Sequence, residues 1–260
     1  MSTRVPVLAA ALLLSAASAG AAGDGGRSEP FSIRGHQLKL HLYGARGAPV
    51  AVVSSGDGGW VHLAPTVAQY LASRGFFVVG FDSKAYLSSF TSGSRTLTVA
   101  EVPGDFAALV DYAGQGAPGS PLLMGVSEGA GLSVLAATAK EVQSRIAGVV
   151  ALGLPEKNEL GWRFRDSMIY VTKKVPNEPL FSVSEQVSRV APVPLAVLRS
   201  THDEFVTAAD TEKILAAARE PRRLWTIDAA DHRFSDRQDE LQRALLEAIA
   251  WIARQRAGSR

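Results

Sequence analysis

The stretch Pro121–Ala137, PLLMGVSEGAGLSVLAA, constrains the fold of this chain more than any other part of the sequence. An apolar run leads into Gly125-Val126-Ser127-Glu128-Gly129, and small and apolar residues at helical spacing follow. This order predicts a buried strand, a sharp turn with Ser127 at its apex, and a helix.

The glycines on either side of Ser127 explain how so tight a turn can form. A side chain at Gly125 or Gly129 would collide with the neighbouring backbone. The turn lifts the serine hydroxyl out of the sheet and places it beside the free N–H groups at the start of a helix, which can stabilise an oxyanion. We therefore interpret the motif as a nucleophile elbow, and a chance Gly/Ser-rich turn is the alternative.

Apolar runs of strand length alternate with helical patterns along most of the chain. This order is typical of a mainly parallel sheet with helices on both faces, so we predict an α/β fold. With 47% hydrophobic residues among 260, one large core is possible, and we expect a single domain over residues 30–260. The expected strands are Phe31–Arg34, Gln37–Tyr43, Pro49–Ser54, Phe76–Phe81, Leu122–Gly125, Ile146–Leu152, Val193–Arg199 and Leu224–Ile227; the expected helices are Leu63–Ser73, Pro103–Tyr112, Glu128–Lys140 and Asp236–Arg254.

The first residues of the chain are typical of a secretory signal. Arg4 precedes the apolar stretch Val5–Ala17, and Ala17-Ser18-Ala19 supplies an A-x-A cleavage site, with Ala19-Gly20-Ala21 as an alternative frame. The apolar stretch is too short to be a stable membrane anchor. We expect residues 1–19 to be a cleaved signal peptide and residues 20–29 a flexible leader; an uncleaved interfacial anchor is the alternative.

Composition excludes several classes of function. The formal net charge is only +2 and no run of Lys and Arg could follow a phosphate backbone, so a nucleic-acid partner is not expected. The chain has no cysteine, which excludes disulfides, thiol catalysis and cysteine-ligated metals.

Ser127 needs a base, because a serine hydroxyl is a weak nucleophile at neutral pH, and the base needs an acid to orient it. After Ser127, one strand runs into a turn that contains Asp203, and a later strand runs into a loop that contains His232. His232 is the only histidine after Asp203. The order nucleophile, acid, base matches enzymes that carry such an elbow, so we predict Ser127, Asp203 and His232 as the catalytic residues. An ordinary surface histidine is the alternative for His232.

Two alternatives remain around Asp203. Glu204 competes with it as the orienting acid; Asp203 is preferred because it comes first after the strand and its shorter arm is more rigid. His202, Asp203 and Glu204 could also hold a metal, but no ligand pair at helical spacing supports this. We therefore expect neither a metal nor another cofactor, and we interpret His202 as a loop residue.

The loop Ser55–Trp60, SGDGGW, follows the third expected strand and can complete an oxyanion hole. The backbone N–H of Glu128, the residue after the nucleophile, should be one donor. We predict Asp57 as the second donor, with Gly58 as the runner-up. A phosphate-binding loop is the alternative, but no Lys-Ser/Thr pair follows the glycines and no G-x-G-x-x-G occurs here.

SGDGGW, the later VVGFDS and the elbow together resemble the bacterial virulence-protein family VirJ/AcvB, from about Pro49 to the C-terminus. SGDGGW is the most specific of these motifs, whereas many hydrolases share the elbow. The family consists of exported α/β-hydrolases, so the resemblance implies the α/β-hydrolase fold and a periplasmic serine hydrolase. Members are linked to hydrolysis of aminoacyl-phosphatidylglycerol and, in plant-associated bacteria, to type IV secretion.

The resemblance has two departures. Glu128 stands where an aromatic residue is expected in close relatives, and the chain resembles only the hydrolase half of the longer members. The implied substrate is the aminoacyl ester of aminoacyl-(lysyl-)phosphatidylglycerol. A general carboxylesterase or dienelactone-hydrolase-like enzyme, and a non-catalytic accessory protein with a secretion-system partner, are the alternatives.

Charged side chains give independent support for such a substrate. Asp57 and Glu128 flank the expected oxyanion hole and could attract an ammonium group; the alternative is that they are solvated turn acids. Residues 156–190 interrupt the strand–helix rhythm, and we interpret them as a small cap over the strand ends. We predict that Trp60, Arg163 and Arg165 contact the substrate. The basic and aromatic residues of the cap could also meet an anionic membrane, and a solvated basic face is the alternative.

Overall fold

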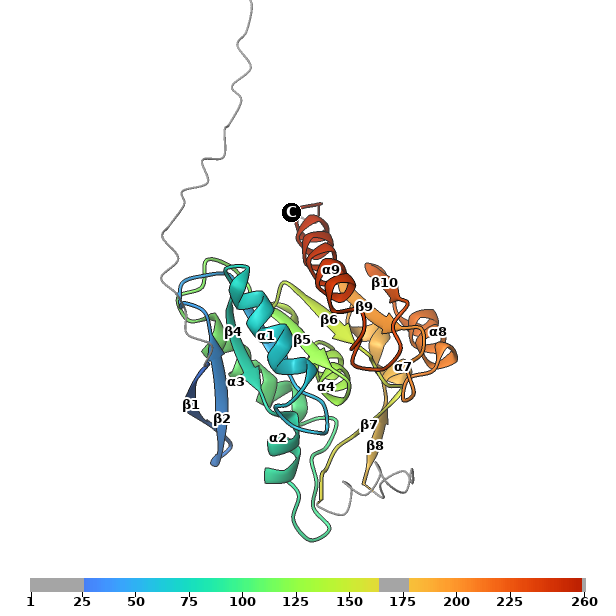
Figure 1. The fold of residues 1–260 in the computed structure, drawn as a ribbon. Helices are drawn as coiled ribbons and strands as arrows, with labels where there is room; N and C mark the ends of the chain where they lie inside the picture. Colours follow the sequence, from blue (N-terminus) through green and yellow to red (C-terminus); the bar gives the residue numbers. More distant parts are fainter. Residues whose placement is uncertain (1–25, 164–177, 259–260) are drawn as a thin grey trace, which may run out of the picture.

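An eight-stranded sheet runs through the molecule in the order β1-β2-β4-β3-β5-β6-β9-β10 (Figure 1). The computed structural model describes residues 26–163 and 178–258. β1 and β2 form an antiparallel hairpin, β2 is antiparallel to β4, and the other neighbours are parallel. The strands are β1 (Arg27–Ile33), β2 (His36–Tyr43), β3 (Val50–Ser54), β4 (Phe77–Phe81), β5 (Leu122–Val126), β6 (Gly148–Leu152), β9 (Leu195–Ser200) and β10 (Arg222–Ile227).

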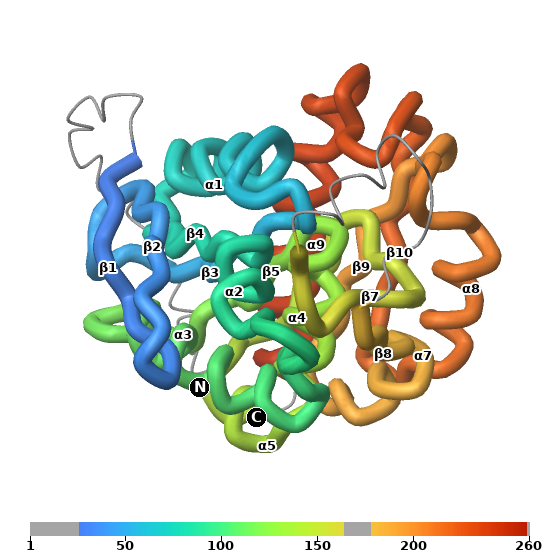
Figure 2. Tube along the Cα trace, turned by 90° about the horizontal axis from the view of Figure 1, so that it is seen from below, coloured from blue at the N-terminus to red at the C-terminus, as the bar shows by residue number. Residues whose placement is uncertain are grey.

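Helices cover both faces of the sheet, which confirms the predicted α/β architecture. α1 (Leu63–Ser73) and α9 (Gln238–Gly258) pack on one face, and α3 (Val102–Gly114), α4 (Glu128–Ala136) and α8 (Ala208–Ala217) pack on the other. In Figure 2, α1 and α3 lie on opposite sides of β3 and β4. Successive side chains of β3 enter the two cores alternately. Both faces of β3, β4, β5 and β6 are therefore buried, which is why these strands are continuous apolar runs, whereas the edge strand β10 is partly exposed and contains Arg222 and Arg223.

The leader predicted to be flexible through residue 29 is shorter than expected. β1 begins at Arg27, which pairs with Leu42, and Glu29 pairs with Leu40. The side chain of Glu29 also accepts hydrogen bonds from Tyr112 at 2.5 Å and Arg46 at 3.1 Å. A polar segment can thus join the sheet, because backbone groups form the ladder whatever the side chains are. The expected signal peptide, residues 1–19, lies outside the described residues.

Several elements were absent from the sequence prediction or shorter than predicted. α4 ends at Ala136 rather than at Lys140, and α5 (Lys140–Gln143) follows it. Helix α8 was missed. So were α2 (Ser83–Ser89), α7 (Val183–Gln186), the 3-10 helix η2 (Val187–Arg189) and the strands β7 (Lys157–Glu159) and β8 (Leu180–Ser182). No helix within the described ranges is both long and apolar enough to cross a bilayer.

The described part of the 156–190 segment forms a small hairpin beside the main sheet. β7 and β8 pair antiparallel. The buried carboxylate of Glu156 fixes the hairpin, accepting hydrogen bonds from Ser182 at 2.5 Å, Ser184 at 2.6 Å and Lys213 of α8 at 2.7 Å. The pKa of Glu156 is lowered because these hydrogen bonds outweigh its burial. The hairpin is therefore firmly attached to the domain.

The order of the strands creates the crevice in which the site lies. β3 and β5 are hydrogen-bonded neighbours, but β3 is followed through α1 by β4 on one side, whereas β5 is followed by β6 on the other. Ligand sites of α/β sheets form at the carboxyl ends of the strands where the chain changes direction in this way. The loop after β3 and the turn after β5 therefore meet.

Candidate active site

Ser127 lies at the turn between β5 and α4 in a strained backbone conformation. Its φ and ψ are 52° and −121°, a region that L-residues with a side chain rarely adopt. The turn has no room for other side chains. A Cβ at Gly125 would lie 2.1 Å from the carbonyl oxygen of Gly129, and a Cβ at Gly129 would lie 2.3 Å from that of Ser55. These clashes confirm the expected reason for both glycines.

The structure brings Asp203 and His232 together from the loops that follow β9 and β10. Nδ1 of His232 lies 2.6 Å from Oδ2 of Asp203, whose side chain is fully buried. The other oxygen of Asp203 accepts the N–H groups of Phe205 and Val206, which fixes the carboxylate. Glu204 instead accepts the backbone N–H of His232 at 2.9 Å. Asp203 thus contacts the imidazole, and Glu204 contacts only the backbone behind it.

Ser127 and His232 line the same pocket, whose volume is about 200 Å³. Nε2 of His232 is buried and makes no hydrogen bond within the described residues. Because Nδ1 is held by Asp203, Nε2 is the nitrogen left to exchange a proton with a hydroxyl in the pocket. Catalytic hydrogen bonds are often long without substrate and shorten when it binds. An Nε2 without a partner in the described part of the chain is therefore compatible with a general base that forms its hydrogen bond to the serine when substrate is present.

Two further features hold the imidazole, and neither was predicted. Gly153, directly after β6, has φ of 56°, and a Cβ there would lie 2.5 Å from Cε1 of His232. The ring of Phe205 lies edge-on to His232 with centroids 5.4 Å apart. Gly153 follows a buried strand at the same sheet edge as Ser127. This position after a strand could have marked Gly153 as a site residue from the sequence, but the contact of Gly153 with His232 depends on the tertiary structure.

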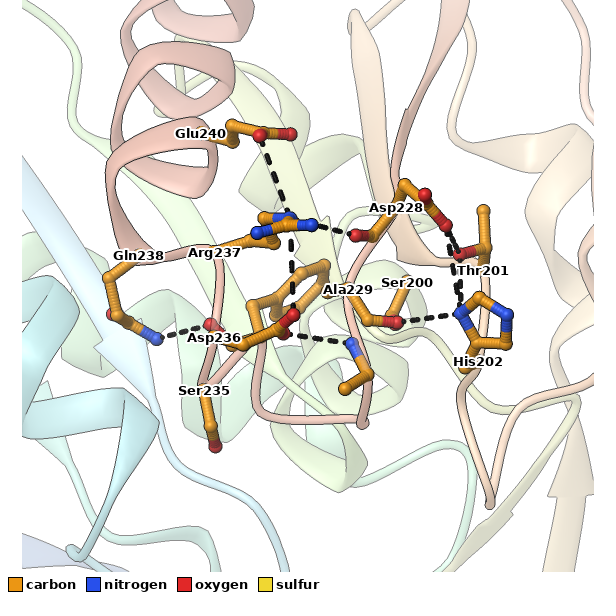
Figure 3. A network of polar contacts seen from close by, with 12 residues as sticks. Ser200, Thr201, His202, Asp228, Ala229, Ser235, Asp236, Arg237, Gln238 and Glu240 are labelled. Carbon is orange, nitrogen blue, oxygen red and sulfur yellow. Dashed lines mark hydrogen bonds and ion pairs between the residues drawn. The ribbon is translucent and has the colours of Figure 1, made fainter.

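The loops that carry Asp203 and His232 are fastened to each other by a polar network (Figure 3). The carbonyl oxygen of Ala229 accepts hydrogen bonds from Ser200 Oγ at 2.9 Å and lies 3.1 Å from Nδ1 of His202. Thr201 donates to Asp228 at 2.7 Å. His202 therefore serves as a loop residue, as interpreted from the sequence. The described residues contain no group of three or more His, Asp or Glu side chains that could hold a metal ion.

The SGDGGW loop lies against Ser127 and lines the pocket with Gly56, Asp57, Gly58 and Gly59. A Cβ at Gly56 would be 3.3 Å from Cβ of Ser127, so the backbone approaches the serine closely. The N–H of Gly59 already donates to Gly56 O at 3.1 Å. Asp57 and Gly58, the two expected candidates for the second oxyanion donor, both line the pocket, as does Glu128.

Trp60 does not face the pocket, and its prediction as a substrate contact is wrong. Its indole N–H donates to Tyr43 at 3.2 Å, its ring stacks on His41 with centroids 4.8 Å apart, and it covers Gly80 of β4. Its backbone N–H donates to Asp82 at 3.2 Å. The tryptophan therefore fastens the loop to the sheet on the side away from the pocket. A large ring is stabilised more by burial against the sheet than by exposure at the loop.

The Arg163 prediction is corrected as well. Its guanidinium pairs with the buried Glu178 and donates to the carbonyl of Gly93 at 2.6 Å, and it does not line the pocket. A buried carboxylate needs a paired cation, so Arg163 holds the hairpin segment together rather than meeting a phosphate. Trp162 is partly buried against the core, with Lys84 above its ring. Arg165 lies outside the described residues.

The inner wall of the pocket is acidic. Glu128, only 6% exposed, accepts the backbone N–H of Glu159 at 2.7 Å, and Asp57 also lines this wall. Burial, together with the charges of Glu159 and Asp57, raises the pKa of Glu128 well above its ordinary value. The alternative of a solvated turn acid is therefore wrong for Glu128. Asp57 and Glu159 thus place further carboxyl groups beside the buried Glu128 on this wall of the pocket.

Replacing Glu128 by glutamine is expected to stabilise the protein more at pH 8 than at pH 4. The raised pKa of Glu128 means that wild-type stability falls as the pH rises from about 4.5, its ordinary value, through the folded-state pKa. Glutamine is neutral throughout and keeps an oxygen for the N–H of Glu159. Below pH 4.5 the two side chains are both neutral and differ little.

Thermal unfolding at the two pH values measures this effect. The exposed Glu212→Gln on α8 is the matched control and should show no such pH-dependent gain. If Glu128→Gln changed the unfolding temperature equally at pH 4 and pH 8, this would contradict the assignment of Glu128 as a buried side chain with a raised pKa.

Comparisons with known proteins agree with this fold. The α/β hydrolase GrgF from Penicillium sp. sh18 is similar with a TM-score of 0.66 at 14% identity, over 87% of this chain and 99% of that chain. Est1E from Butyrivibrio proteoclasticus has a TM-score of 0.62 at 15% identity, over 87% and 100%. A membrane phospholipase A described as a novel bacterial virulence factor has a TM-score of 0.64 at 10% identity, over 88% and 87%.

Sequence comparison identifies a family as well as a fold. No curated protein sequence matches the chain. Residues 48–166, which include SGDGGW and the elbow, match the family model described as bacterial virulence protein (VirJ), so the predicted resemblance is confirmed over that range. The chain thus has the α/β-hydrolase fold and carries, over residues 48–166, the sequence pattern of the VirJ family of bacterial virulence proteins.

Proposed function

We propose that this protein is a serine hydrolase that cleaves carboxylic esters, with Ser127 as nucleophile, His232 as base and Asp203 as orienting acid. One observation carries the proposal: a serine on a strained elbow opens on the same pocket as a histidine whose Nδ1 is held by a buried aspartate and whose Nε2 makes no hydrogen bond within the described chain. This is the division of roles that acyl transfer requires.

The reaction follows from these positions. Nε2 of His232 takes the proton of Ser127 as Oγ attacks the ester carbonyl, and Asp203 stabilises the resulting imidazolium. The N–H groups of Glu128 and of Asp57, or of Gly58, hold the oxyanion. His232 then gives its proton to the leaving alcohol, and an acyl group stays on Ser127. A water molecule, deprotonated by His232, attacks this acyl-enzyme and releases the acid.

We propose further that the ester joins an amino acid to the glycerol headgroup of phosphatidylglycerol and that the exported protein acts in the periplasm. This substrate is the one that the family resemblance implies, and residues 48–166 match the VirJ family model. The pocket supports it too, because its inner wall carries Asp57, Glu128 and Glu159, while the exposed lining residues include the cations Lys157 and Arg233. An ammonium inside and a phosphate outside would each meet the opposite charge.

A panel of esters tests the substrate. Lysyl-phosphatidylglycerol should be cleaved with a higher kcat/KM than a neutral acyl ester of similar size. A bound ammonium would favour the ionised form of Glu128 and so offset its raised pKa. Glu128→Gln should therefore reduce the rate on the lysyl ester about tenfold and leave the neutral ester nearly unchanged, because the oxyanion-binding N–H stays while the group that can pair with the ammonium is lost. Equal losses on both esters would show that Glu128 does not read the ammonium and would favour a general carboxylesterase.

A non-catalytic accessory protein on the same fold is the remaining alternative. A fluorophosphonate reagent, which labels activated serines, separates the two possibilities. Labelling that depends on Ser127 supports the enzyme, whereas an intact protein that resists labelling supports the accessory role.

A further inference from the structure

We propose that the mouth of the active-site pocket docks on an anionic lipid bilayer through a rim made of Val61, Lys157, Phe205 and Arg233. The inference rests on the proposed lipid substrate and deepens it by naming the surface through which a lipid headgroup reaches Ser127. The rim shares Lys157 with the 156–190 segment expected from the sequence to meet a membrane, but it does not use Arg163, which pairs with Glu178 and does not line the pocket.

The size of the pocket requires such a surface. At about 200 Å³ it is smaller than the roughly 300–1,000 Å³ of pockets that enclose drug-sized ligands, so it can take a headgroup but not two acyl chains. Each methylene of an acyl chain strongly favours the bilayer over water. A lipid ester can therefore reach Ser127 only if its chains remain in the membrane and the pocket mouth comes to the membrane surface.

Exposed apolar side chains stand at this mouth. Phe205 is 56% exposed and Val61 is 46% exposed, the two highest values among the exposed large hydrophobic residues in the described ranges. They come from the loops after β9 and β3, far apart in sequence, yet both line the pocket. Single exposed apolar residues are ordinary, whereas these two lie at one opening and form the apolar part of the proposed contact surface.

The charges of the rim suit an anionic surface. Lys157 on β7 and Arg233, next to His232, are exposed and line the pocket. The acids of the lining are less accessible: Glu128 is buried, and Asp57 and Glu159 are half-buried. Apolar side chains that enter the interface, with cations at the level of the phosphates, are the arrangement by which proteins bind the surface of an anionic bilayer.

Binding to vesicles tests the surface without relying on turnover. The parent is full-length mature protein with Ser127→Ala, mixed with vesicles of phosphatidylglycerol and phosphatidylcholine or of phosphatidylcholine alone. The rim variant adds Val61→Ser, Lys157→Gln and Arg233→Gln; Phe205 is left in place because it touches His232. The matched control adds Leu224→Ser, Lys140→Gln and Arg254→Gln, which remove an exposed apolar side chain and two exposed cations outside the pocket lining.

The parent should sediment with the anionic vesicles and bind the phosphatidylcholine vesicles far less. The rim variant should bind the anionic vesicles about 25-fold more weakly at low salt, since each cation near such a surface contributes roughly a fivefold factor. Added salt should weaken the parent more than the rim variant. The control should bind like the parent, and thermal unfolding should show all variants folded.

Three outcomes would each overturn the proposal. The rim variant could bind like the parent, the control could lose as much affinity as the rim variant, or the parent could show no preference for anionic vesicles. Wild-type activity on lysyl-phosphatidylglycerol dispersed in detergent separates this from the proposed function. If wild-type protein turns over the detergent-dispersed lipid but the rim variant binds vesicles like the parent, only the docking surface is overturned. If vesicle binding depends on the rim but wild-type protein does not turn over the lipid, only the proposed substrate is overturned.

Discussion

Ser127→Ala is expected to lower kcat for ester hydrolysis by at least about 10⁴-fold, because removal of a triad nucleophile leaves only the contributions of substrate binding and the oxyanion hole. The substitution removes one oxygen atom at a partly exposed position and creates no cavity in the core. It keeps the N–H of Glu128 at the start of α4. The loss should therefore appear in kcat rather than in stability.

Steady-state kinetics and fluorophosphonate labelling check this expectation. Thermal unfolding should shift by only a few degrees, and the circular dichroism spectrum should be unchanged. Ser133→Ala on the same helix is the matched control, since Ser133 is buried and donates to Gly129 and Met124 rather than facing the pocket. A folded Ser127→Ala protein that keeps more than about a tenth of wild-type activity would remove the basis of the proposed mechanism.

Asp203→Asn is expected to lower kcat about 10⁴-fold, the second largest effect. The carboxylate accepts Nδ1–H of His232 and leaves Nε2 as the basic nitrogen. An asparagine amide in the same place can donate to Nδ1, which moves the imidazole proton to Nε2 and removes the base from the serine. The two backbone N–H groups of Phe205 and Val206 would still find an acceptor oxygen, so the loop should stay folded.

Glu204→Gln is the matched control for Asp203→Asn. Glutamine keeps an oxygen for the backbone N–H of His232, the contact that Glu204 makes in the structure. Its kcat should fall by no more than a few-fold. Measurement of kcat against pH for both variants distinguishes the two acids, and a larger loss for Glu204→Gln than for Asp203→Asn would reverse their roles.

The sequence by itself determined the α/β architecture and the family match. Strand-length apolar runs, helical spacing and turn glycines are local signals, and burial of both strand faces makes them strong. The helix Leu63–Ser73 was predicted with its observed bounds. Ser127 at a strand–turn–helix junction could be named in advance, since Gly125 and Gly129 are required by the turn itself. The chain order of Ser127, Asp203 and His232 suggested their relation.

Only the tertiary structure decided which side chains meet. Asp203 and Glu204 are neighbours in sequence, and the direction of each is set by loops from β9 and β10 that fold against one another. Trp60 turned away from the pocket because Gly80, on another strand, leaves space for its ring. Glu128 is buried by β7, and Arg163 is paired with Glu178 across the hairpin segment. Such contacts join residues distant in the chain, so no local pattern records them, whereas the elbow is local and could be recognised from its five residues.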